Sequence, residues 1–335
     1  MIFIVYISGD GKMKGFKAYL LITLTIFLLS LSTYTVRDNN RIKIVHQEVK
    51  IDNLPRELDG FTILQVTDLH EKEFGKKQSR LIEKINSLSY DVIVFTGDML
   101  KDSKSTNYKP FFTLLEGIEN KENAFFVPGN TDPDVYKLNT ENPFKKTDFY
   151  YGMEQRGVKL LESLSTVEKG TSKVHFVDFE LSIQDAEKSL EFLKLVDNIR
   201  YLNHQKQLFK EISTLDNRDD SNVLIGLTHY PVVDARFDYL MSGQNYIVGD
   251  YDLIMAGHYH GGQIRIPFLG ALFIPEGWYP RDGLFPPQDR VKGLWEYRDI
   301  KQYVSTGLGN SDAIPFLDFR LFNTPEVNLI TLSDK

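Results

Sequence analysis

The sequence of 335 residues predicts a layered α/β fold behind an N-terminal hydrophobic segment. Two observations predict the fold. Apolar runs of strand length recur along the chain, and such runs suit strands that are covered on both faces. Helical patterns, with apolar side chains three and four residues apart, lie between these runs. Strand and helix in alternation are typical of helices packed in layers on a sheet.

The composition is that of an ordinary globular chain, with 42% hydrophobic and 25% charged residues. The chain has no cysteine, which excludes disulfides, thiolate catalysis and zinc–cysteine sites. Its formal net charge of -7 argues against capture of a nucleic-acid backbone, so we expect no nucleic-acid partner. Any phosphate that the chain handles then needs a local positive charge, such as a metal ion.

The first element is an uncharged apolar run over residues 18–36, preceded by Lys12, Lys14 and Lys17. Such a run can cross a bilayer as a helix, and the lysines favour a cytoplasmic N-terminus. We expect residues 1–37 to be a signal or single-pass anchor segment and residues 38–335 to be an extracytoplasmic catalytic domain. A cleaved signal peptide, a buried core helix and a start at Met13 remain alternatives.

The strand-like runs that follow end abruptly at polar residues. The carboxyl ends of strands form the ligand crevice in layered α/β folds. A single polar residue at such an end is usually part of a turn, but here five ends carry only side chains that can bind metal. The runs are FTILQVTDLH (61–70), DVIVFTGD (91–98), AFFVPGN (124–130), VLIGLTH (223–229) and DLIMAGHYH (252–260), and their metal-capable side chains are Asp68, His70, Asp98, Asn130, His229, His258 and His260.

These residue types fit two divalent ions. Carboxylate, imidazole and amide donors suit manganese, iron, zinc or similar ions. Residues i and i+2 of an extended segment face the same way, so we expect Asp68 with His70, and His258 with His260, to point into one cavity. The carboxylate of Asp98 can bridge the ions. Two ions about 4 Å apart can hold a phosphoryl group and convert a bound water to hydroxide.

The order DxH, GD, GN, H and GHxH over residues 61–262 resembles the calcineurin-like metallophosphoesterase superfamily. The segments HGGQ (260–263), VSTGLGNS (304–311) and PEVNLITL (325–332) are similar to its membrane-associated branch of the YkuE and YaeI type, which includes a UDP-2,3-diacylglucosamine pyrophosphatase. The resemblance implies a four-layer α/β/β/α sandwich with two mixed sheets. It also implies one ion on Asp68, His70 and His260 and another on Asn130, His229 and His258, with Asp98 bridging.

The chain departs from this superfamily after GN, where Thr131 replaces a common histidine and Asp132 remains. The histidine of relatives lies near the leaving group, and threonine cannot supply a proton near neutral pH. Loss of a general acid commonly costs on the order of 10² to 10⁴ in rate, and a poor alkoxide leaving group suffers most. We therefore expect a diphosphate to be preferred over an alkyl phosphodiester, with Thr131 and Asp132 as weak catalytic candidates. Tyr259, within GHYH, is expected to point away from the metals and to pack.

Between the third and fourth strand ends, residues 173–183 predict a strand and residues 186–202 predict an amphipathic helix. The remaining histidines have no ligand-like neighbours in the sequence, so we expect structural or surface roles for them. They are His46, His175 and His204.

The segment IPFLGALFIPEGWYPRDGLFPP (266–287) is rich in aromatic residues and proline. It either covers a sheet, or it rests on a bilayer or holds an acyl chain, since tryptophan and tyrosine favour the membrane interface. Arginines can hold a phosphate by bidentate contacts, although a structural role is the default. The candidates are Arg265, Arg281 and Arg320.

The sequence thus predicts a membrane-anchored hydrolase with two metal ions. It is expected to cleave a phosphodiester or diphosphate bond by in-line attack of metal-bound hydroxide, on an envelope or lipid-linked substrate. Two alternatives remain open. Thr131 favours a metal- or phospholigand-binding scaffold with weak catalysis. A soluble nucleotide phosphodiesterase is the other, and the hydrophobic segment and negative charge count against it.

Overall fold

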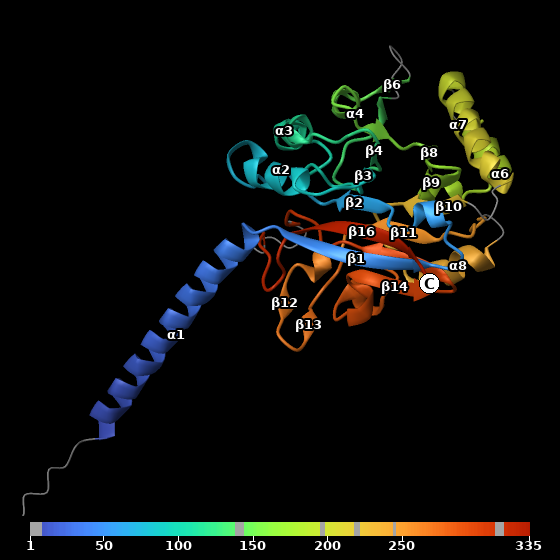
Figure 1. The fold of residues 1–335 in the computed structure, drawn as a ribbon. Helices are drawn as coiled ribbons and strands as arrows, with labels where there is room; N and C mark the ends of the chain where they lie inside the picture. The colour runs from blue at the N-terminus through green and yellow to red at the C-terminus, as the bar shows by residue number, and fades with distance from the viewer. Residues whose placement is uncertain (1–8, 138–143, 195–197, 218–221, 244–245, 312–317) are drawn as a thin grey trace, which may run out of the picture.

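The computed structural model describes residues 9–137, 144–194, 198–217, 222–243, 246–311 and 318–335. Two six-stranded sheets pack face to face, and helices lie on their outer sides (Figure 1). Both sheets mix parallel and antiparallel strands. The predicted four-layer α/β/β/α fold is therefore confirmed.

The first sheet contains the strands that precede the first three predicted strand ends. Its central strands run parallel to one another, and the C-terminal strand inserts antiparallel beside them. In spatial order the strands are β1 (Lys43–Ile51), β16 (Glu326–Asp334), β2 (Thr62–Val66), β3 (Val92–Phe95), β4 (Ala124–Phe126) and β7 (Lys159–Leu160).

The second sheet contains the strands that precede the last two predicted strand ends, and its two edge strands are antiparallel. In spatial order its strands are β14 (Gly293–Tyr297), β15 (Ile300–Val304), β11 (Leu253–Ala256), β10 (Asn222–Leu227), β9 (Ser172–Asp178) and β8 (Leu164–Lys169). Two small ribbons stand apart from the sheets. They pair β5 (Tyr136–Lys137) with β6 (Lys145–Lys146), and β12 (Arg265–Ile266) with β13 (Gly270–Ala271).

The helices fall into three groups. The N-terminal helix α1 (Gly9–Asn39) extends away from the body (Figure 1). Helices α2 (Ser79–Asn86), α3 (Lys109–Gly117) and α4 (Asp148–Glu154) cover the first sheet, and α5 (Phe179–Ser182), α6 (Ala186–Leu193), α7 (Ile199–Ile212) and α8 (Asp234–Ser242) lie beside the second. Short 3-10 turns are η1 (Arg56–Leu58), η2 (Lys76–Gln78), η3 (Ser213–Asn217), η4 (His260–Gly262), η5 (Pro280–Gly283) and η6 (Gln288–Arg290).

Burial on both faces explains why the strands read as continuous apolar runs. Successive side chains of a strand point to opposite faces of the sheet. In β2, Leu64 and Val66 pack against the helices, whereas Ile63 packs between the two sheets. All three side chains are fully buried. A polar side chain inside such a strand needs a buried hydrogen-bond partner, as Gln65 has in Thr96 at 2.9 Å, whereas the strand ends carry polar groups more freely.

Two predicted elements between residues 173 and 202 are shorter than expected. The predicted strand ends at Asp178, because its carboxylate accepts a hydrogen bond from the Leu181 N–H at 2.7 Å and begins α5. The predicted single helix is two helices, α6 and α7. Asp185 caps the first and Asn198 caps the second, so each helix has its own start signal.

Helix α1 is long and apolar enough to cross a membrane over Phe16–Asn39, and none of its most hydrophobic stretch is buried in the body. The alternative of a buried core helix therefore does not fit. Its carboxyl end is fixed to the body, because the Asn39 side chain exchanges two hydrogen bonds of 2.7 Å with the backbone of Arg320.

The core beneath α3 and α4 should dominate stability. We expect Phe126→Ala, at a fully buried position, to lower the free energy of unfolding by about 3–5 kcal/mol. Phe192→Ala, at a position 71% exposed, should change it by less than about 0.5 kcal/mol. Chemical denaturation of the full chain in detergent would measure both, and similar midpoints for the two variants would contradict the assigned core.

Candidate metal centre

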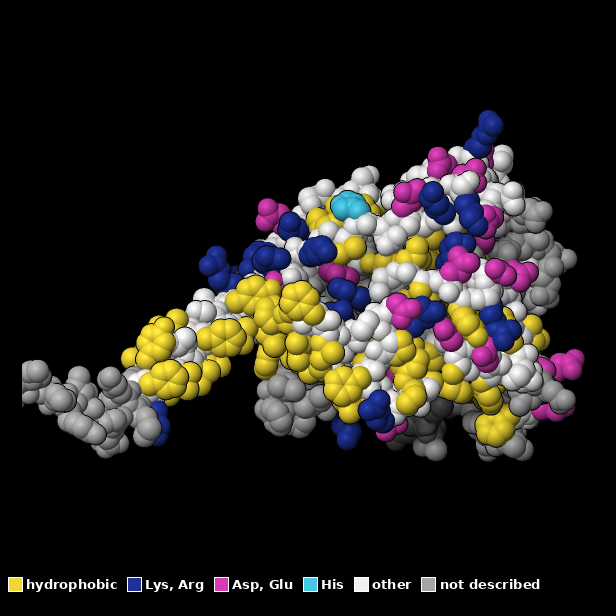
Figure 2. All heavy atoms as spheres, turned by 90° about the horizontal axis from the view of Figure 1, so that it is seen from below, with side chains coloured by type: hydrophobic (Ala, Val, Ile, Leu, Met, Phe, Trp, Pro, Cys, Tyr) yellow, Lys and Arg dark blue, Asp and Glu magenta, His cyan; other side chains and the backbone are white. Residues whose placement is uncertain are grey.

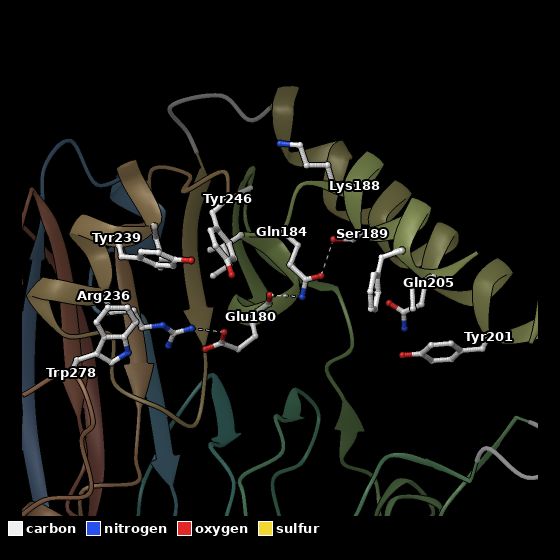
Figure 3. A pocket seen from close by; sticks show the side chains of 14 residues that line it. Glu180, Gln184, Lys188, Ser189, Tyr201, Gln205, Arg236, Tyr239, Tyr246 and Trp278 are labelled. Atoms are coloured by element: carbon white, nitrogen blue, oxygen red, sulfur yellow. Dashed lines mark hydrogen bonds and ion pairs between the residues drawn. The ribbon is translucent and has the colours of Figure 1, made fainter. Parts of the chain in front are cut away.

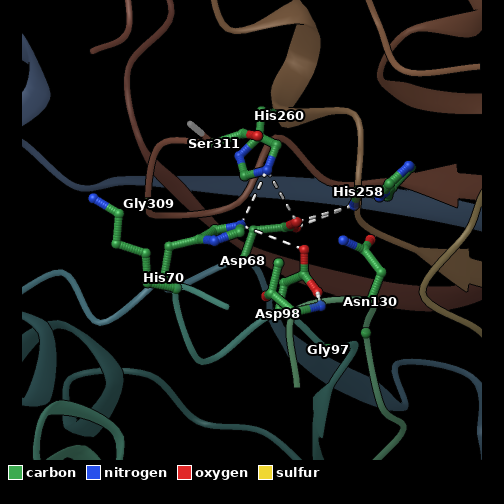
Figure 4. Close-up of polar contacts among 12 residues, drawn as sticks. Asp68, His70, Gly97, Asp98, Asn130, His258, His260, Gly309 and Ser311 are labelled. Atoms are coloured by element: carbon green, nitrogen blue, oxygen red, sulfur yellow. Dashed lines mark hydrogen bonds and ion pairs between the residues drawn. The ribbon is translucent and has the colours of Figure 1, made fainter. Parts of the chain in front are cut away.

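The seven predicted metal ligands follow strands of both sheets and come together, and six of them are labelled in Figure 4. The first group of donors is formed by Asp68, His70, Asp98 and His260, all buried. The His70 Nε2 atom lies 3.2 Å from His260 Nε2 and 3.4 Å from Asp98 Oδ2. Asp68 Oδ1 lies 3.4 Å from His260 Nε2.

The second group contains Asp98, His229 and His258. The His229 Nε2 atom lies 3.3 Å from Asp98 Oδ2, 3.1 Å from His258 Nδ1 and 3.2 Å from Asn130 Oδ1. The same Asp98 oxygen thus reaches both groups. The clusters are consistent with a two-metal site.

The local backbone differs from the extended segments that we expected. β2 ends at Val66 and β11 at Ala256, and five of the seven side chains are placed by left-handed backbone instead. Such conformations cost about 1–3 kcal/mol each for non-glycine residues and gather at functional sites. The five φ angles are 52° at Asp68, 45° at His70, 56° at Asp98, 70° at His258 and 48° at His260.

Two glycines allow the loops after β3 and β4 to approach each other. A Cβ on Gly129 would lie 2.2 Å from Asp98 Oδ1, and a Cβ on Gly97 would lie 2.5 Å from the Gly129 nitrogen. Gly97 also has a φ of 86°. The GD and GN motifs therefore require glycine because the backbone packs directly on the Asp98 carboxylate.

Asp132 fixes these two loops. Its buried carboxylate accepts hydrogen bonds from the backbone N–H groups of Asp98 at 2.8 Å and of Gly129 at 2.9 Å. It also accepts from Met99 at 3.0 Å and Leu100 at 3.3 Å. These contacts support a positioning role for Asp132.

Thr131 lies beside Asp98, and both of its donors are used. Its N–H donates to Asp98 Oδ1 at 2.8 Å, and its hydroxyl donates to the Leu100 carbonyl at 2.7 Å. In this arrangement the hydroxyl proton is directed at the backbone and not at a leaving group.

The electrostatics of the site favour a bound cation. Burial by itself lowers the pKa of His229, but the carboxylate of Asp98 raises it to about 9. Burial raises the pKa of Asp98, but His229, His70 and the Thr131 N–H bring it well below its usual range. Burial and neighbouring His229 lower the pKa of His258 to about 3. The cluster thus attracts positive charge: without a bound cation it favours a proton on His229, whereas the imidazole of His258 stays neutral.

The imidazole of His229 is oriented to bind a metal. Its Nδ1 lies 2.8 Å from the Thr96 carbonyl and donates to it, so the lone pair is on Nε2, which faces Asp98, Asn130 and His258. His258 in turn donates to the backbone of Pro275. Since the converging nitrogen and oxygen donors are also those that manganese, iron and zinc accept, the residues present fit a pair of divalent ions.

The three candidate phosphate-binding arginines do not gather at the metal centre. Arg320 is fully buried and donates to the carbonyls of Gly309 at 2.7 Å and Thr306 at 2.6 Å, which makes its role structural. Arg265 donates to the Gly261 carbonyl at 2.8 Å, and Arg281 is exposed.

Tyr259 and the histidines outside the metal centre lie where the sequence predicted structural or surface roles. Tyr259 is buried in the core around Trp295 and donates to Glu276, as expected for packing. His204 pairs with Glu162 at 2.8 Å and lies outside both donor clusters. His175 contacts Thr166, and His46 is exposed.

Sequence reasoning missed two residues that adjoin the centre. The Asn323 side chain donates to the His260 carbonyl at 2.6 Å, and no motif marks it. The Tyr230 ring lies 4.7 Å from the ring of His258 and 5.2 Å from that of His229, centroid to centroid. The position of Tyr230 directly after His229 is the one available signal.

A pocket of about 800 Å³ opens beside His258, lined in part by Tyr230 and Trp278. It shares Glu180, Arg236 and Trp278 with a second pocket of about 600 Å³, which extends between α8 and the helices α6 and α7 (Figure 3). Arg236 and Glu180 form an ion pair of 2.6 Å where the two pockets meet. The metal centre therefore adjoins a long pocket with both aromatic and charged walls.

Comparison with known proteins places this site in context. Residues 61–262, more than half of the chain, match the family model described as calcineurin-like phosphoesterase. The metallophosphoesterase YkuE of Bacillus subtilis is 27% identical over 87% of this chain and 85% of its own length. A metallophosphoesterase of Campylobacter jejuni is 25% identical over 94% of this chain and 69% of its own length. The UDP-2,3-diacylglucosamine pyrophosphatase LpxG of Chlamydia muridarum is 24% identical over 86% of this chain and 88% of its own length.

The close approach at Gly129 gives a direct test of the loop geometry. We expect Gly129→Ala to displace Asp98 and to lower the metal content of the purified protein, because the new Cβ would lie only 2.2 Å from Asp98 Oδ1. Gly249→Ala is the control, since a Cβ there meets nothing within 4 Å. Equal metal content in the two variants, measured by elemental analysis, would contradict the geometry.

The Asp132 contacts give a second test. We expect Asp132→Asn to weaken manganese binding by about 10- to 100-fold, as is usual when a group that orients metal ligands is lost. The exposed Asp134→Asn should bind manganese like the unmodified protein. Calorimetric titration of the metal-free proteins measures this, and unchanged affinity for Asp132→Asn would exclude the positioning role.

Proposed function

Because the chain belongs to the calcineurin-like phosphoesterase family, we propose that it is a two-metal hydrolase that cleaves a phosphodiester or diphosphate bond of an envelope or lipid-linked substrate. One observation carries the proposal. A single oxygen of Asp98 lies 3.4 Å from His70 Nε2 and 3.3 Å from His229 Nε2, so that two donor groups share one carboxylate. Such sharing is suited to a pair of ions and has no evident use in a purely structural cluster.

In the proposed mechanism, the residues of the chain bind the metal ions, fix the orientation of the metal ligands and exclude water from them. Divalent ions bound here would supply positive charge to the phosphoryl oxygens and would activate a water for in-line attack. One ion is assigned to Asp68, His70 and His260, and the other to Asn130, His229 and His258, with Asp98 shared. Asp132 and the two close-packed glycines keep the shared carboxylate in place. Burial excludes competing water from all of these ligands except Asn130, which is exposed, and His258, which lines the pocket.

The pocket beside His258 supports a substrate larger than a simple phosphate ester. Tyr230 and Trp278 offer aromatic surfaces to a base or sugar. The similarity to a UDP-2,3-diacylglucosamine pyrophosphatase, at 24% identity, supports the diphosphate class. The exposed helix α1 supports a location at the membrane, and Lys12, Lys14 and Lys17 support an extracytoplasmic body.

Thr131 supports the same substrate class. Its hydroxyl is engaged by the Leu100 carbonyl, so it gives no proton to a departing oxygen. A phosphate group that leaves from a diphosphate is already a weak base, so it departs readily without being protonated. An alkoxide is a strong base and leaves slowly without a proton.

Hydrolysis by the metal-reconstituted full chain tests the proposal. The substrates are an aryl phosphodiester, an alkyl phosphodiester and a nucleotide-sugar diphosphate. We expect manganese-dependent turnover of the aryl ester and the diphosphate. Asp98→Asn should lower this turnover by at least about 10²-fold, because losing a metal ligand costs no less than losing a group that orients one. Asp148→Asn, at an exposed carboxylate, should retain it. Two bound metals with no turnover of any substrate would favour the binding scaffold instead.

The effect of Thr131 on the preferred leaving group can be tested separately. We expect Thr131→His to raise alkyl phosphodiester turnover relative to diphosphate turnover by about 10²-fold, the lower end of the usual contribution of a general acid. The ratio of kcat/KM values for the two substrates measures this. An unchanged ratio in a variant that still binds two metals would refute the role assigned to position 131.

A further inference from the structure

We propose that the β12–β13 hairpin and the loop over residues 320–324 form a second membrane-contacting surface, which inserts into the bilayer interface beside α1. This inference rests on the proposed membrane location of the chain and deepens it, because it assigns lipid-borne phosphates as the substrate class. We call this the interfacial surface and define it by Ile266, Phe268, Leu269 and Phe322.

The interfacial surface is apolar and projects from the body. Phe268, at the tip of the hairpin, is 110% exposed, and Leu269 is 52% exposed. Ile266 and Phe322 are each 41% exposed. Phe268 and Phe322 also have left-handed φ angles of 68° and 50°, which bulky residues rarely adopt. An apolar tip held outward in a strained conformation is typical of a contact surface.

The interfacial surface is attached to the end of α1. The rings of Tyr34 and Phe322 lie 5.3 Å apart, centroid to centroid. The Thr324 hydroxyl donates to Asp38 at 2.7 Å, and backbone hydrogen bonds join Leu321 to Gln263 and Arg265. Hydrophobic side chains consequently continue from α1 onto the adjoining face of the body (Figure 2). A bilayer crossed by α1 would therefore meet this face first.

The charged side chains near the carboxyl end of α1 also suit contact with a bilayer. The chain as a whole has a net charge of -7, yet exposed cationic side chains gather where α1 joins the body (Figure 2). Arg80 donates a hydrogen bond to Asn40 at 3.3 Å, and it lines one pocket with two further cations, Arg41 and Lys84, and a single acidic residue, Glu83. Cationic residues beside an apolar surface suit anionic lipid head groups. A protein partner would explain the apolar tip but not its continuity with an exposed membrane-length helix.

The interfacial surface lies close to the metal centre along the chain. The β12 strand begins five residues after His260, and the 320–324 loop supplies Asn323 and Arg320 to the His260 carbonyl, at 2.6 Å and 3.4 Å. The loop that carries Phe322 therefore contacts the backbone of a predicted metal ligand, which connects the interfacial surface to the metal centre. A substrate whose phosphate is borne by a lipid in the bilayer is then presented to the site without leaving the membrane.

Fluorescent labelling of the full chain tests the interfacial surface. The chain contains no cysteine, so a single introduced cysteine labels one position only. Phe268→Cys reports on the hairpin tip and Leu24→Cys reports on α1. Tyr151→Cys, at an exposed position on α4 on the far side of the body from α1, is the matched control (Figure 1). Each protein carries an environment-sensitive dye and is reconstituted into vesicles of phosphatidylcholine and phosphatidylglycerol.

We expect quenching by a lipid-borne quencher, and protection from aqueous iodide, at positions 24 and 268 but not at 151. Lipid exposure at 24 with iodide quenching at 268 would overturn the interfacial surface and leave the anchor intact. Iodide quenching at all three positions would overturn both. Protection of position 268 from both quenchers would indicate a protein contact, such as a second copy of the chain, and would also overturn the inference.

Activity provides an independent readout. Phe268→Ser lies outside the metal ligands and should leave turnover of a water-soluble aryl phosphodiester unchanged. It should lower turnover of a lipid-borne diphosphate in vesicles several-fold. Loss of both activities would point to misfolding or to failure of the metal centre. Equal retention of both would show that the interfacial surface has no role in substrate delivery.

Discussion

The shared carboxylate of Asp98 is the constraint around which the rest of the structure is arranged. One of its oxygens faces imidazoles from both sheets, and the other accepts the Thr131 N–H. Holding a carboxylate in that position requires a loop with left-handed backbone, a glycine pressed against it and a second carboxylate, Asp132, that binds the surrounding N–H groups. The cost of strain and of buried like charges is offset when cations occupy the centre.

The sandwich architecture makes this convergence possible. Strands buried on both faces supply stiff apolar supports, and their ends from two sheets meet along one edge of the molecule. Neither sheet alone provides both donor groups: Asp68, His70, Asp98 and Asn130 follow strands of the first sheet, while His229, His258 and His260 follow strands of the second. The metal centre is thus also a junction between the sheets, and its ligands contribute to their alignment.

Much of this arrangement can be predicted from sequence, because apolar runs locate strands and polar residues at their ends locate the crevice. The layered fold and the gathering of the seven side chains follow from that pattern. The pattern does not show that the strands form two sheets, since both faces of every central strand are buried in either case. Nor does it show how side chains point, because residues i and i+2 face the same way only in extended backbone, whereas His258 and His260 have left-handed conformations. Long-range contacts such as those of Arg320 and Asn323 leave no local signal.

The attachment of Asn39 to Arg320 also bears on how the molecule would tolerate proteolytic processing. A cut near Ser30, Ser32 or Thr33 would remove most of the apolar helix but would retain Asp38 and Asn39, which bond to Thr324 and Arg320. The body released by such a cut would keep the hydrogen bonds between Asn39 and Arg320, and Arg320 in turn contacts the His260 carbonyl. A cut only a few residues later, beyond Asn39, would leave the Arg320 N–H without its side-chain acceptor in a buried position. The side chains of α1 that hydrogen-bond to the body therefore lie in the last turn of the helix.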